Sequence, residues 1–207
     1  MIDNIKKSTN YLQEKGFRNA EIGIILGTGL GQLIDEIDII CQVNYDQIPH
    51  FPIATVESHK GKLVYGNLAG KNVLIMQGRF HIYEGYSLQE VTYPIRVMEK
   101  LGINTLLISN AAGAINLEYK KGELMLIEDH INLQGGSPLA FKGVEKLGTR
   151  FTDMSDPYNK ELNNSFEQIA KMKNIKLHKG VYSSVIGPQL ETKAEYKMLK
   201  IIGSDAV

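Results

Sequence analysis

Residues 78 to 87, GRFHIYEGYS, gather four chemically active side chains between two glycines. Arg79 keeps its charge at any relevant pH, and its planar guanidinium can bind two phosphate oxygens at once. In an extended segment, His81 and Tyr83 would project from the same face as Arg79, because alternate residues of a strand share a face. Glu84 would then point elsewhere and could orient a neighbour. The pattern favours a segment shaped around an anionic ligand over a solvated loop with polar residues by chance.

A second candidate for anion binding is the turn GTGLG, residues 27 to 31, which follows the apolar run EIGIIL. A strand, a glycine turn and a following helix, LGQLIDEI, would aim backbone N–H groups and a positive dipole end at one point, and Thr28 adds a hydroxyl. Taken alone, the motif is equally compatible with a tight turn that binds nothing. Gln32 stands where the dinucleotide fingerprint G-x-G-x-x-G requires glycine, which argues against NAD.

The stretch SNAAGAIN, residues 109 to 116, is another turn of small residues after an apolar run, NTLLIS. Open α/β sheets bind ligands where strand ends leave a crevice, so this turn and GTGLG could face one ligand. Ala111, Ala112 and Gly113 are small enough to let a ligand approach the backbone closely. Taken alone, the stretch is also typical of an ordinary strand exit.

Two further residues gain interest from their neighbours. His59 stands in SHKGK, just before the strands that lead to Arg79. A lone histidine is more often structural, but this position favours a ligand role. Glu191, in IGPQLETKAEY, stands at the expected start of the last helix, where the helix dipole favours a carboxylate. It could instead accept hydrogen bonds from a ring N–H and an amino group of a purine; taken alone, the helix-start role is favoured.

These residues must be positioned by strands and helices that alternate along the chain. Apolar periodicity and turn residues predict strands at 21–26, 62–66, 72–78, 104–109, 123–129 and 176–185, and helices at 4–15, from Ser87 onward, at 160–173 and from Thr192 to Gly203. Ser87 and Thr192 each open a capping box with a glutamate three residues later. The alternation predicts one α/β domain over residues 1–207, with SDAV at 204–207 as the start of a further strand.

Composition excludes several classes of protein. Lysine and arginine number 23, and so do aspartate and glutamate, so any anion site must be local and no basic surface for nucleic acid or membrane is expected. No apolar run approaches the ~20 residues that cross a bilayer, and the polar N-terminus differs from a secretory signal. Cys41 is the only cysteine, which leaves no disulfide and no cysteine-based zinc site. We therefore expect a reduced, intracellular, soluble protein.

Taken together, the stretches resemble the trimeric, 6-oxopurine type of purine nucleoside phosphorylase. The resemblance is carried, in order and over essentially the whole chain, by GTGLG, SHKGKLVYG, GRFHIYEGYS, SNAAGAIN, DHINL, GTRFTDMSDPY and GPQLETKAEY. It implies a three-layer sandwich with a mixed, distorted central β-sheet flanked by helices, assembled as a cytoplasmic homotrimer. It also implies phosphorolysis of purine (deoxy)nucleosides such as inosine and guanosine in purine salvage. Inorganic phosphate would be a co-substrate, with no cofactor, metal, nucleic acid or membrane involved.

The same resemblance assigns roles residue by residue. Phosphate binding is implied for Thr28, His59, Arg79, Phe80, His81 and Ala111. Contacts with ribose and purine are implied for Tyr83, Ala112, Gly113 and Glu191, and for Phe151 of a neighbouring subunit. Of these, Arg79, His81 and Glu191 would be the catalytic residues.

The sequence departs from the family at two places. Leu190 stands where mammalian members carry an aromatic residue, which affects packing on the sugar. Family members also continue past SDAV with a segment that supplies further phosphate, ribose and purine contacts. By resemblance we expect a domain that lacks this closing segment, and a 207-residue form with weak activity or none. The alternatives are a methylthioadenosine phosphorylase, whose base-recognition segment differs from ETKAE, and a non-catalytic remnant that binds phosphate and purine.

Overall fold

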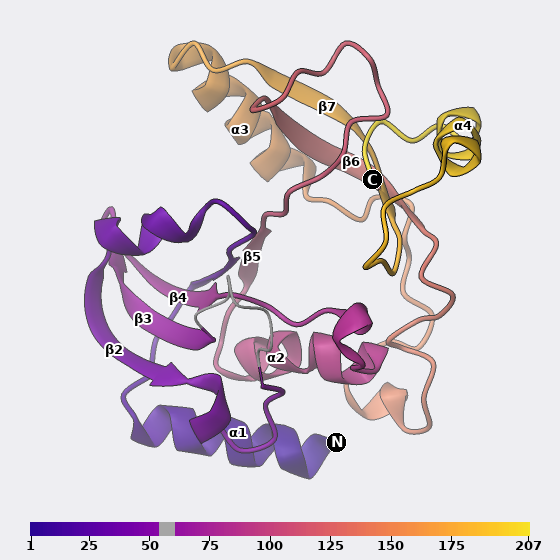
Figure 1. Ribbon diagram of the computed structural model, residues 1–207. Coiled ribbons are helices and arrows are strands. Elements are labelled where there is room, and N and C mark those ends of the chain that lie inside the picture. Colours follow the sequence, from indigo (N-terminus) through magenta and orange to yellow (C-terminus); the bar gives the residue numbers. More distant parts are fainter. Residues whose placement is uncertain (54–60) are drawn as a thin grey trace. The chain divides into compact units, whose positions relative to one another are not determined.

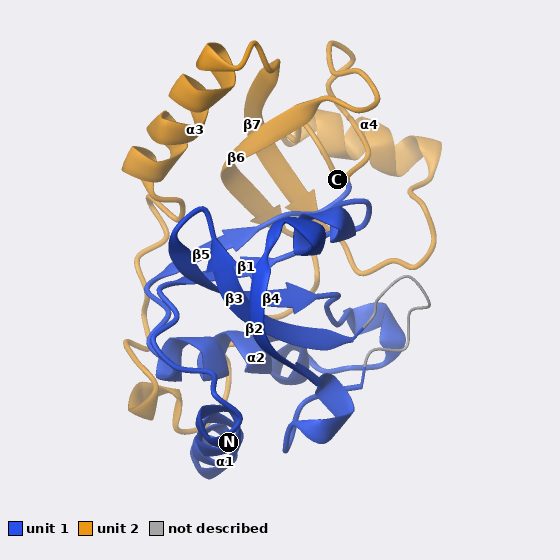
Figure 2. Cartoon of the chain, turned by 90° about the vertical axis from the view of Figure 1, so that its left-hand side faces the viewer, with its two compact units in different colours: residues 1–111 blue, residues 112–207 orange. Residues whose placement is uncertain are grey.

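A computed structural model describes residues 1–53 and 61–207. The chain forms two compact units, residues 1–111 and 112–207 (Figure 2). The first contains α1 (Ile2–Glu14), β1 (Ile22–Ile25), η1 (Gly31–Glu36), β2 (Asp38–Asn44), η2 (Tyr45–Gln47), β3 (Lys62–Leu68), β4 (Lys71–Gln77), η3 (Ile82–Glu84), α2 (Leu88–Lys100) and β5 (Thr105–Ile108) (Figure 1). The second contains β6 (Leu124–Asn132), η4 (Val144–Lys146), α3 (Lys160–Met172), β7 (Leu177–Ser184) and α4 (Lys193–Ile201).

The first unit is built on a five-stranded mixed sheet with the order β2-β3-β4-β1-β5. β1 runs parallel to β4 and β5, so that Ile24 pairs with Ile75 on one side and with Leu107 on the other. β3 runs antiparallel to both β2 and β4. Because β4, β1 and β5 are parallel, their carboxyl ends lie at one edge of the sheet. The three segments that the sequence marks for ligand binding, after residues 77, 26 and 108, all begin at that edge.

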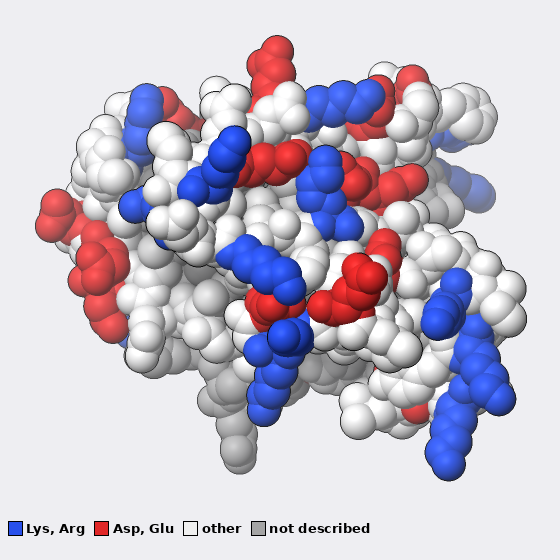
Figure 3. Space-filling view, turned by 90° about the horizontal axis from the view of Figure 1, so that it is seen from above, with Lys and Arg blue, Asp and Glu red and all other residues white. Residues whose placement is uncertain are grey.

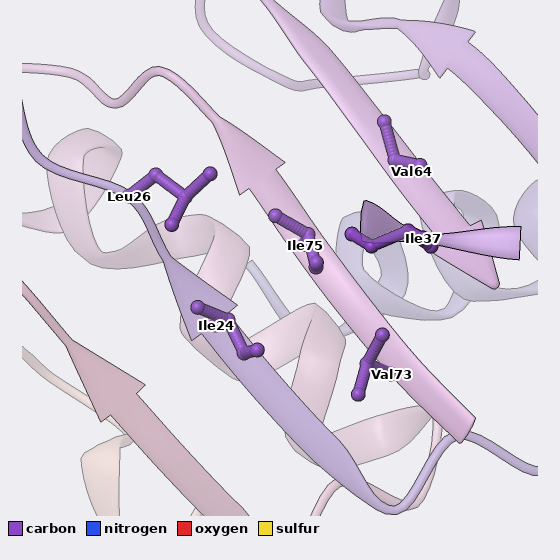
Figure 4. Packing of buried hydrophobic residues seen from close by; sticks show 6 residues of the cluster. All are labelled: Ile24, Leu26, Ile37, Val64, Val73 and Ile75. Atoms are coloured by element: carbon purple, nitrogen blue, oxygen red, sulfur yellow. The ribbon is translucent and has the colours of Figure 1, made fainter. Parts of the chain in front are cut away.

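Each face of this sheet is covered by apolar side chains, as the alternation of residues along buried strands requires. On one face, Leu33 and Ile34 of η1 pack against a cluster formed by Ile24, Leu26, Ile37, Val64, Val73 and Ile75 (Figure 4). On the opposite face, Gly23 lies close to α2, and a Cβ there would be 3.3 Å from the sulfur of Met98. Apolar packing therefore covers both faces of the sheet, and the loops begin at its edge.

The second unit is organised around the parallel pair β6 and β7, whose register runs from Leu124 opposite Leu177 to Asn132 opposite Ser184. α3 is tied to this pair by Lys179 of β7, whose ammonium lies 3.1 Å from the carboxylate of Glu167. Ala206 forms isolated bridges with Ala114 and Tyr182, so the strand expected at 204–207 is present as a short bridging segment.

The charged surface agrees with the balanced composition. In the view of Figure 3, basic and acidic side chains are interleaved, with no broad field of one sign. Among the helices of residues 1–53 and 61–207, none is both long and apolar enough to cross a membrane.

Most elements expected from the sequence are present, with bounds within a few residues of the expected ones. Two elements depart from the expectations. The stretch after GTGLG forms only η1, a 3-10 helix of 6 residues, so the expected helix there is wrong. The hydrogen bonds of a 3-10 helix have poorer geometry than those of an α-helix. The turn therefore lacks the α-helix dipole that was expected to favour an anion there. β2 was not expected, because its residues Asp38–Asn44 are largely exposed and lack clear alternation. The prediction of one domain over residues 1–207 stays a prediction.

Replacing Ile75 by alanine should lower the free energy of unfolding by about 2–5 kcal/mol, because the side chain is fully buried at the centre of the sheet and its removal leaves a cavity. The matched control is Ile40→Ala on β2, where the side chain is 60% exposed and the same change should cost little. Urea denaturation of both variants measures the difference. Equal losses would contradict the assignment of the core.

Candidate active site

Arg79 joins the exits of two strands of the first unit. It follows the end of β4 by way of Gly78, whose φ of 100° lies in the left-handed region that glycine adopts readily. One terminal nitrogen of its guanidinium donates to the carbonyl oxygen of Ser109, just after β5, at 2.6 Å. Its Nε donates to Nε2 of His81 at 3.2 Å. These bonds fix the plane of a charge-bearing fork at the carboxyl edge of the sheet.

The hydrogen bonds of His81 define its protonation. Since the Nε of Arg79 can only donate, Nε2 of His81 accepts and the ring is neutral there. Its Nδ1 therefore carries the hydrogen and donates to Oε1 of Glu84 at 2.8 Å. The same oxygen accepts the backbone N–H of His81 at 2.8 Å, and the Glu84 side chain is only 3% exposed. Glu84 thus orients the imidazole, as a carboxylate does in many histidine sites.

Tyr83 lies directly on His81, with ring centroids 4.6 Å apart and planes 11° from parallel. Burial raises the pKa of Tyr83, the Glu84 carboxylate raises it further, and Arg79 counteracts both. The prediction that the segment is extended through Tyr83 is wrong, because the backbone turns into η3 after His81. Arg79, His81 and Tyr83 nevertheless form one contiguous group, through side-chain contacts that replace the shared face of a strand.

Phe80 belongs to the core of the first unit. Its side chain is buried, and its ring packs 5.1 Å from that of Tyr45 and 6.0 Å from that of Tyr86. Any contact of Phe80 with phosphate is therefore restricted to its backbone. His59 lies outside the described residues.

The glycine turn after β1 is held against the exit of β5. The N–H of Gly27 donates to Oγ of Ser109 at 3.0 Å, and that hydroxyl donates to the carbonyl of Ile25 at 3.2 Å. A Cβ on Gly27 would lie 2.5 Å from the Ser109 carbonyl oxygen, so only glycine fits. Thr28, the next residue, is exposed, as is Ala111. The turn and Arg79 therefore share one anchor, Ser109.

Sequence reasoning missed Ser109. Its hydroxyl sits among small residues in a turn where no charge or aromatic group draws attention, and its partners lie 82 and 30 positions away in the chain. The role of Glu84 had a local signal, because the spacing His81-x-x-Glu84 is that of a capping box, which the structure contains.

In the second unit, the loop that contains Ala112 and Gly113 is paired with the last residues of the chain. The N–H of Gly113 donates to the carbonyl of Val207 at 2.8 Å, and its own carbonyl accepts from the N–H of Val207 at 2.9 Å. Both backbone groups of Gly113 are thus engaged within the protein. Ala112 is exposed.

Glu191 precedes α4, but it is not the cap. The N-cap of α4 is Thr192, whose hydroxyl accepts from the N–H of Glu195 at 3.2 Å while the Glu195 carboxylate accepts from the N–H of Thr192 at 2.6 Å. The helix-start role favoured for Glu191 is therefore wrong. Its carboxylate accepts a hydrogen bond from the hydroxyl of Tyr196, which raises the pKa of Tyr196. Glu191 is thus positioned by a side chain and retains further acceptor capacity.

Phe151 lies on the loop between β6 and α3 with 87% of its surface exposed, and Leu190 is 82% exposed. The contribution of Phe151 to a neighbouring subunit stays a prediction. Among the described residues, histidine, cysteine and carboxylate side chains nowhere gather in a group of three that could hold a metal ion.

Comparison with known proteins places this geometry in context. Residues 21–207 match the phosphorylase superfamily. Purine nucleoside phosphorylase 1 of Bacillus subtilis (strain 168) is 48% identical over 207 residues, which are 100% of this chain and 76% of the relative. The purine nucleoside phosphorylase of Rattus norvegicus is 39% identical over 212 residues, 99% of this chain and 73% of that protein.

Solved structures of purine nucleoside phosphorylases are also similar to this chain. The purine nucleoside phosphorylase of Schistosoma mansoni in complex with adenosine superposes with a TM-score of 0.93 at 42% identity, covering 100% of this chain and 74% of that one. Isoform 2 from the same organism, in complex with cytosine and ribose-1-phosphate, gives a TM-score of 0.93 at 40% identity, with 99% and 74% covered. The predicted α/β fold with a central mixed sheet flanked by helices is confirmed. The chain spans about three quarters of these relatives.

Replacing Gly27 by alanine should weaken the binding of inorganic phosphate by about tenfold or more and cost about 1–3 kcal/mol of stability, because the methyl group would overlap the backbone after β5. Gly31→Ala is the matched control in the same turn, since a Cβ there meets no atom within 4 Å. Titration calorimetry with phosphate measures the first effect and thermal unfolding the second. Unchanged phosphate affinity in Gly27→Ala would contradict the importance of the Ser109 anchor.

Proposed function

Since the chain belongs to the purine nucleoside phosphorylase family of pentosyltransferases, we propose that its substrates are the 6-oxopurine nucleosides inosine and guanosine and their deoxy forms. Inorganic phosphate is the second substrate, and the products are the free base and (deoxy)ribose 1-phosphate. Purine salvage in the cytoplasm is the setting we propose for it. The alternative of a methylthioadenosine phosphorylase has no comparable support, because the relatives reported above are named purine nucleoside phosphorylases.

The observation that carries the proposal is the guanidinium of Arg79, fixed by the carbonyl of Ser109 and the imidazole of His81. Cleavage of a glycosidic bond makes C1′ cationic, and a bound phosphate dianion stabilises that charge and then attacks it. A phosphate oxygen forms the new bond to C1′, while the bonding electrons leave with the purine. No protein nucleophile is required, so the chain contributes positioning and charge.

His81 complements Arg79 at the anion. Glu84 orients the imidazole through Nδ1, and Nε2 accepts from Nε of Arg79. Hydrogen phosphate, which carries one proton at neutral pH, would replace Arg79 as the donor to Nε2 when it binds. Thr28 and the backbone at Ala111 add neutral donors. Tyr83, stacked on His81, would contact the adjacent ribose.

Glu191 is proposed to recognise the purine base by hydrogen bonding. A carboxylate accepts hydrogen bonds only, and a 6-oxopurine presents an N1–H donor. Adenine presents a bare N1 acceptor at the same place, so its lone pair would face the carboxylate. Adenosine is the informative competitor, because a relative from Schistosoma mansoni was solved with it.

We also propose that the protein is a homotrimer in which Phe151 reaches the ribose bound by a neighbouring subunit. The support is its near-complete exposure at 87%, which is unusual for phenylalanine on a polar loop.

Arg79→Ala should lower kcat/KM for phosphate in guanosine phosphorolysis by about a hundredfold or more, since one charge-assisted contact in such a site is worth about 2–4 kcal/mol. Arg79→Lys should recover part of the loss, because it keeps the charge without the planar fork. Arg18→Ala, which removes an exposed arginine of the same unit, serves as control. Near-normal turnover of Arg79→Ala at limiting phosphate would refute the assignment.

The protein should prefer inosine over adenosine by about tenfold or more in kcat/KM, because adenine would leave the Glu191 carboxylate without a donor. Glu191→Gln should narrow that ratio, since an amide can donate to the N1 of adenine. Steady-state assays with both nucleosides test this. A ratio that Glu191→Gln leaves unchanged would remove Glu191 from base recognition.

A further inference from the structure

Asp205 occupies the centre of the hydrogen-bond network in the second unit. Its carboxylate accepts from two different segments: Oδ1 from the side-chain amide of Asn116 at 3.0 Å, and Oδ2 from the backbone N–H of Val181 at 2.9 Å. Asn116 lies on the same loop as Ala112 and Gly113, between β5 and β6, and Val181 belongs to β7. One side chain therefore connects the loop to the strand.

The backbone of residues 205–207 reinforces this connection on both sides. On the side of the loop, the carbonyl of Asp205 accepts from the N–H groups of Ile115 and Asn116, at 2.8 and 3.0 Å. On the side of β7, the N–H of Asp205 donates to the carbonyl of Val181 at 2.9 Å, and Ser183 donates to Ala206 at 2.8 Å. The segment acts as a strut that sets the distance between the loop and β7.

The strut needs space beside β7, and Gly180 supplies it. A Cβ on Gly180 would lie 2.6 Å from Oδ2 of Asp205, closer than any relaxed contact. The glycine thus lets the carboxylate approach the strand closely enough to accept the N–H of Val181.

We propose that Asp205 is a positioning residue for nucleoside binding, which holds the backbone at Ala112 and Gly113 in the place where it meets the ribose and the purine. This inference rests on the proposed function, which gives those two residues their ligand. Asp205 acts through the loop and does not itself touch the substrate. Its loss shifts the loop and weakens the nucleoside contacts, while the phosphate grip of Arg79, which belongs to the first unit, keeps its own anchors.

The chemistry of the pair makes the carboxylate specific. Both groups that face it are donors, and an amide at 205 would turn one N–H₂ towards a donor. Asn116 cannot simply rotate to accept, because its Oδ1 already receives the N–H of Glu118 at 3.1 Å. If the two side chains are exchanged, the bonds to Glu118 and Val181 and the bond between residues 116 and 205 are kept: an aspartate at 116 accepts from Glu118 and from the new amide, and the amide oxygen at 205 accepts from Val181. The bond from the Asn116 amide to Tyr119 is lost in the exchange.

The experiment is a double-mutant cycle of Asp205→Asn, Asn116→Asp and the two together in the whole chain, with KM measured separately for inosine and phosphate. We expect Asp205→Asn to raise KM for inosine by about tenfold, since a small misplacement of a binding segment has large effects, while KM for phosphate stays within about twofold. The exchanged double variant should return the inosine KM to within about threefold of the parent. Asp156→Asn, the same change at an exposed carboxylate of this unit, is the control.

An unchanged inosine KM in Asp205→Asn overturns the proposal, and so do equal rises in both KM values or a folded double variant that fails to recover. Should Asp205→Asn not fold, the folded double variant decides: a parental inosine KM supports the proposal and a raised one overturns it. Hydrogen exchange of the Gly113 amide follows the loop independently of activity. If this 207-residue chain shows no phosphorolysis, as the weak or absent activity expected from its sequence allows, hydrogen exchange decides: faster exchange in Asp205→Asn, reversed in the double variant, supports the strut, and unchanged exchange overturns it.

Discussion

The bond from the Arg79 guanidinium to the Ser109 carbonyl is the interaction on which the candidate site depends. It spans 2.6 Å and connects the exit of β4 to the exit of β5. The same serine holds the turn at Gly27 through its hydroxyl, so three strand exits converge on one residue. This convergence is possible because β4, β1 and β5 are parallel and end at one edge. The positive charge at this edge is local, because the formal net charge of the protein is zero.

Charge in this site is arranged in a short series of donors and acceptors. Arg79 donates to His81, and His81 donates to Glu84, which is nearly buried. The series fixes the orientation of the Arg79 guanidinium and of the His81 imidazole. Such preorganisation suits the proposed reaction, in which phosphate must be held in line with the bond it attacks. In the second unit, the Asp205 carboxylate likewise joins two segments, because it accepts hydrogen bonds from both Asn116 and Val181.

Local sequence patterns predicted those features of the site and fold that depend on residues close together in the sequence. The group Arg79, His81 and Tyr83 could be nominated because residue types and spacing are read directly, and the capping box at Thr192 defined the start of α4. Ser109 and Asp205 could not be found, because their roles arise from contacts with residues 82 and 89 positions away. The helix expected after GTGLG failed for a related reason: apolar spacing alone does not distinguish two 3-10 turns from an α-helix.

The most direct test of this account is a crystal structure of the protein with orthophosphate bound. We expect phosphate oxygens within hydrogen-bond distance of the Arg79 guanidinium and the Thr28 hydroxyl, with Ser109 still holding the guanidinium. Phosphate bound elsewhere, with no contact to Arg79, would contradict it.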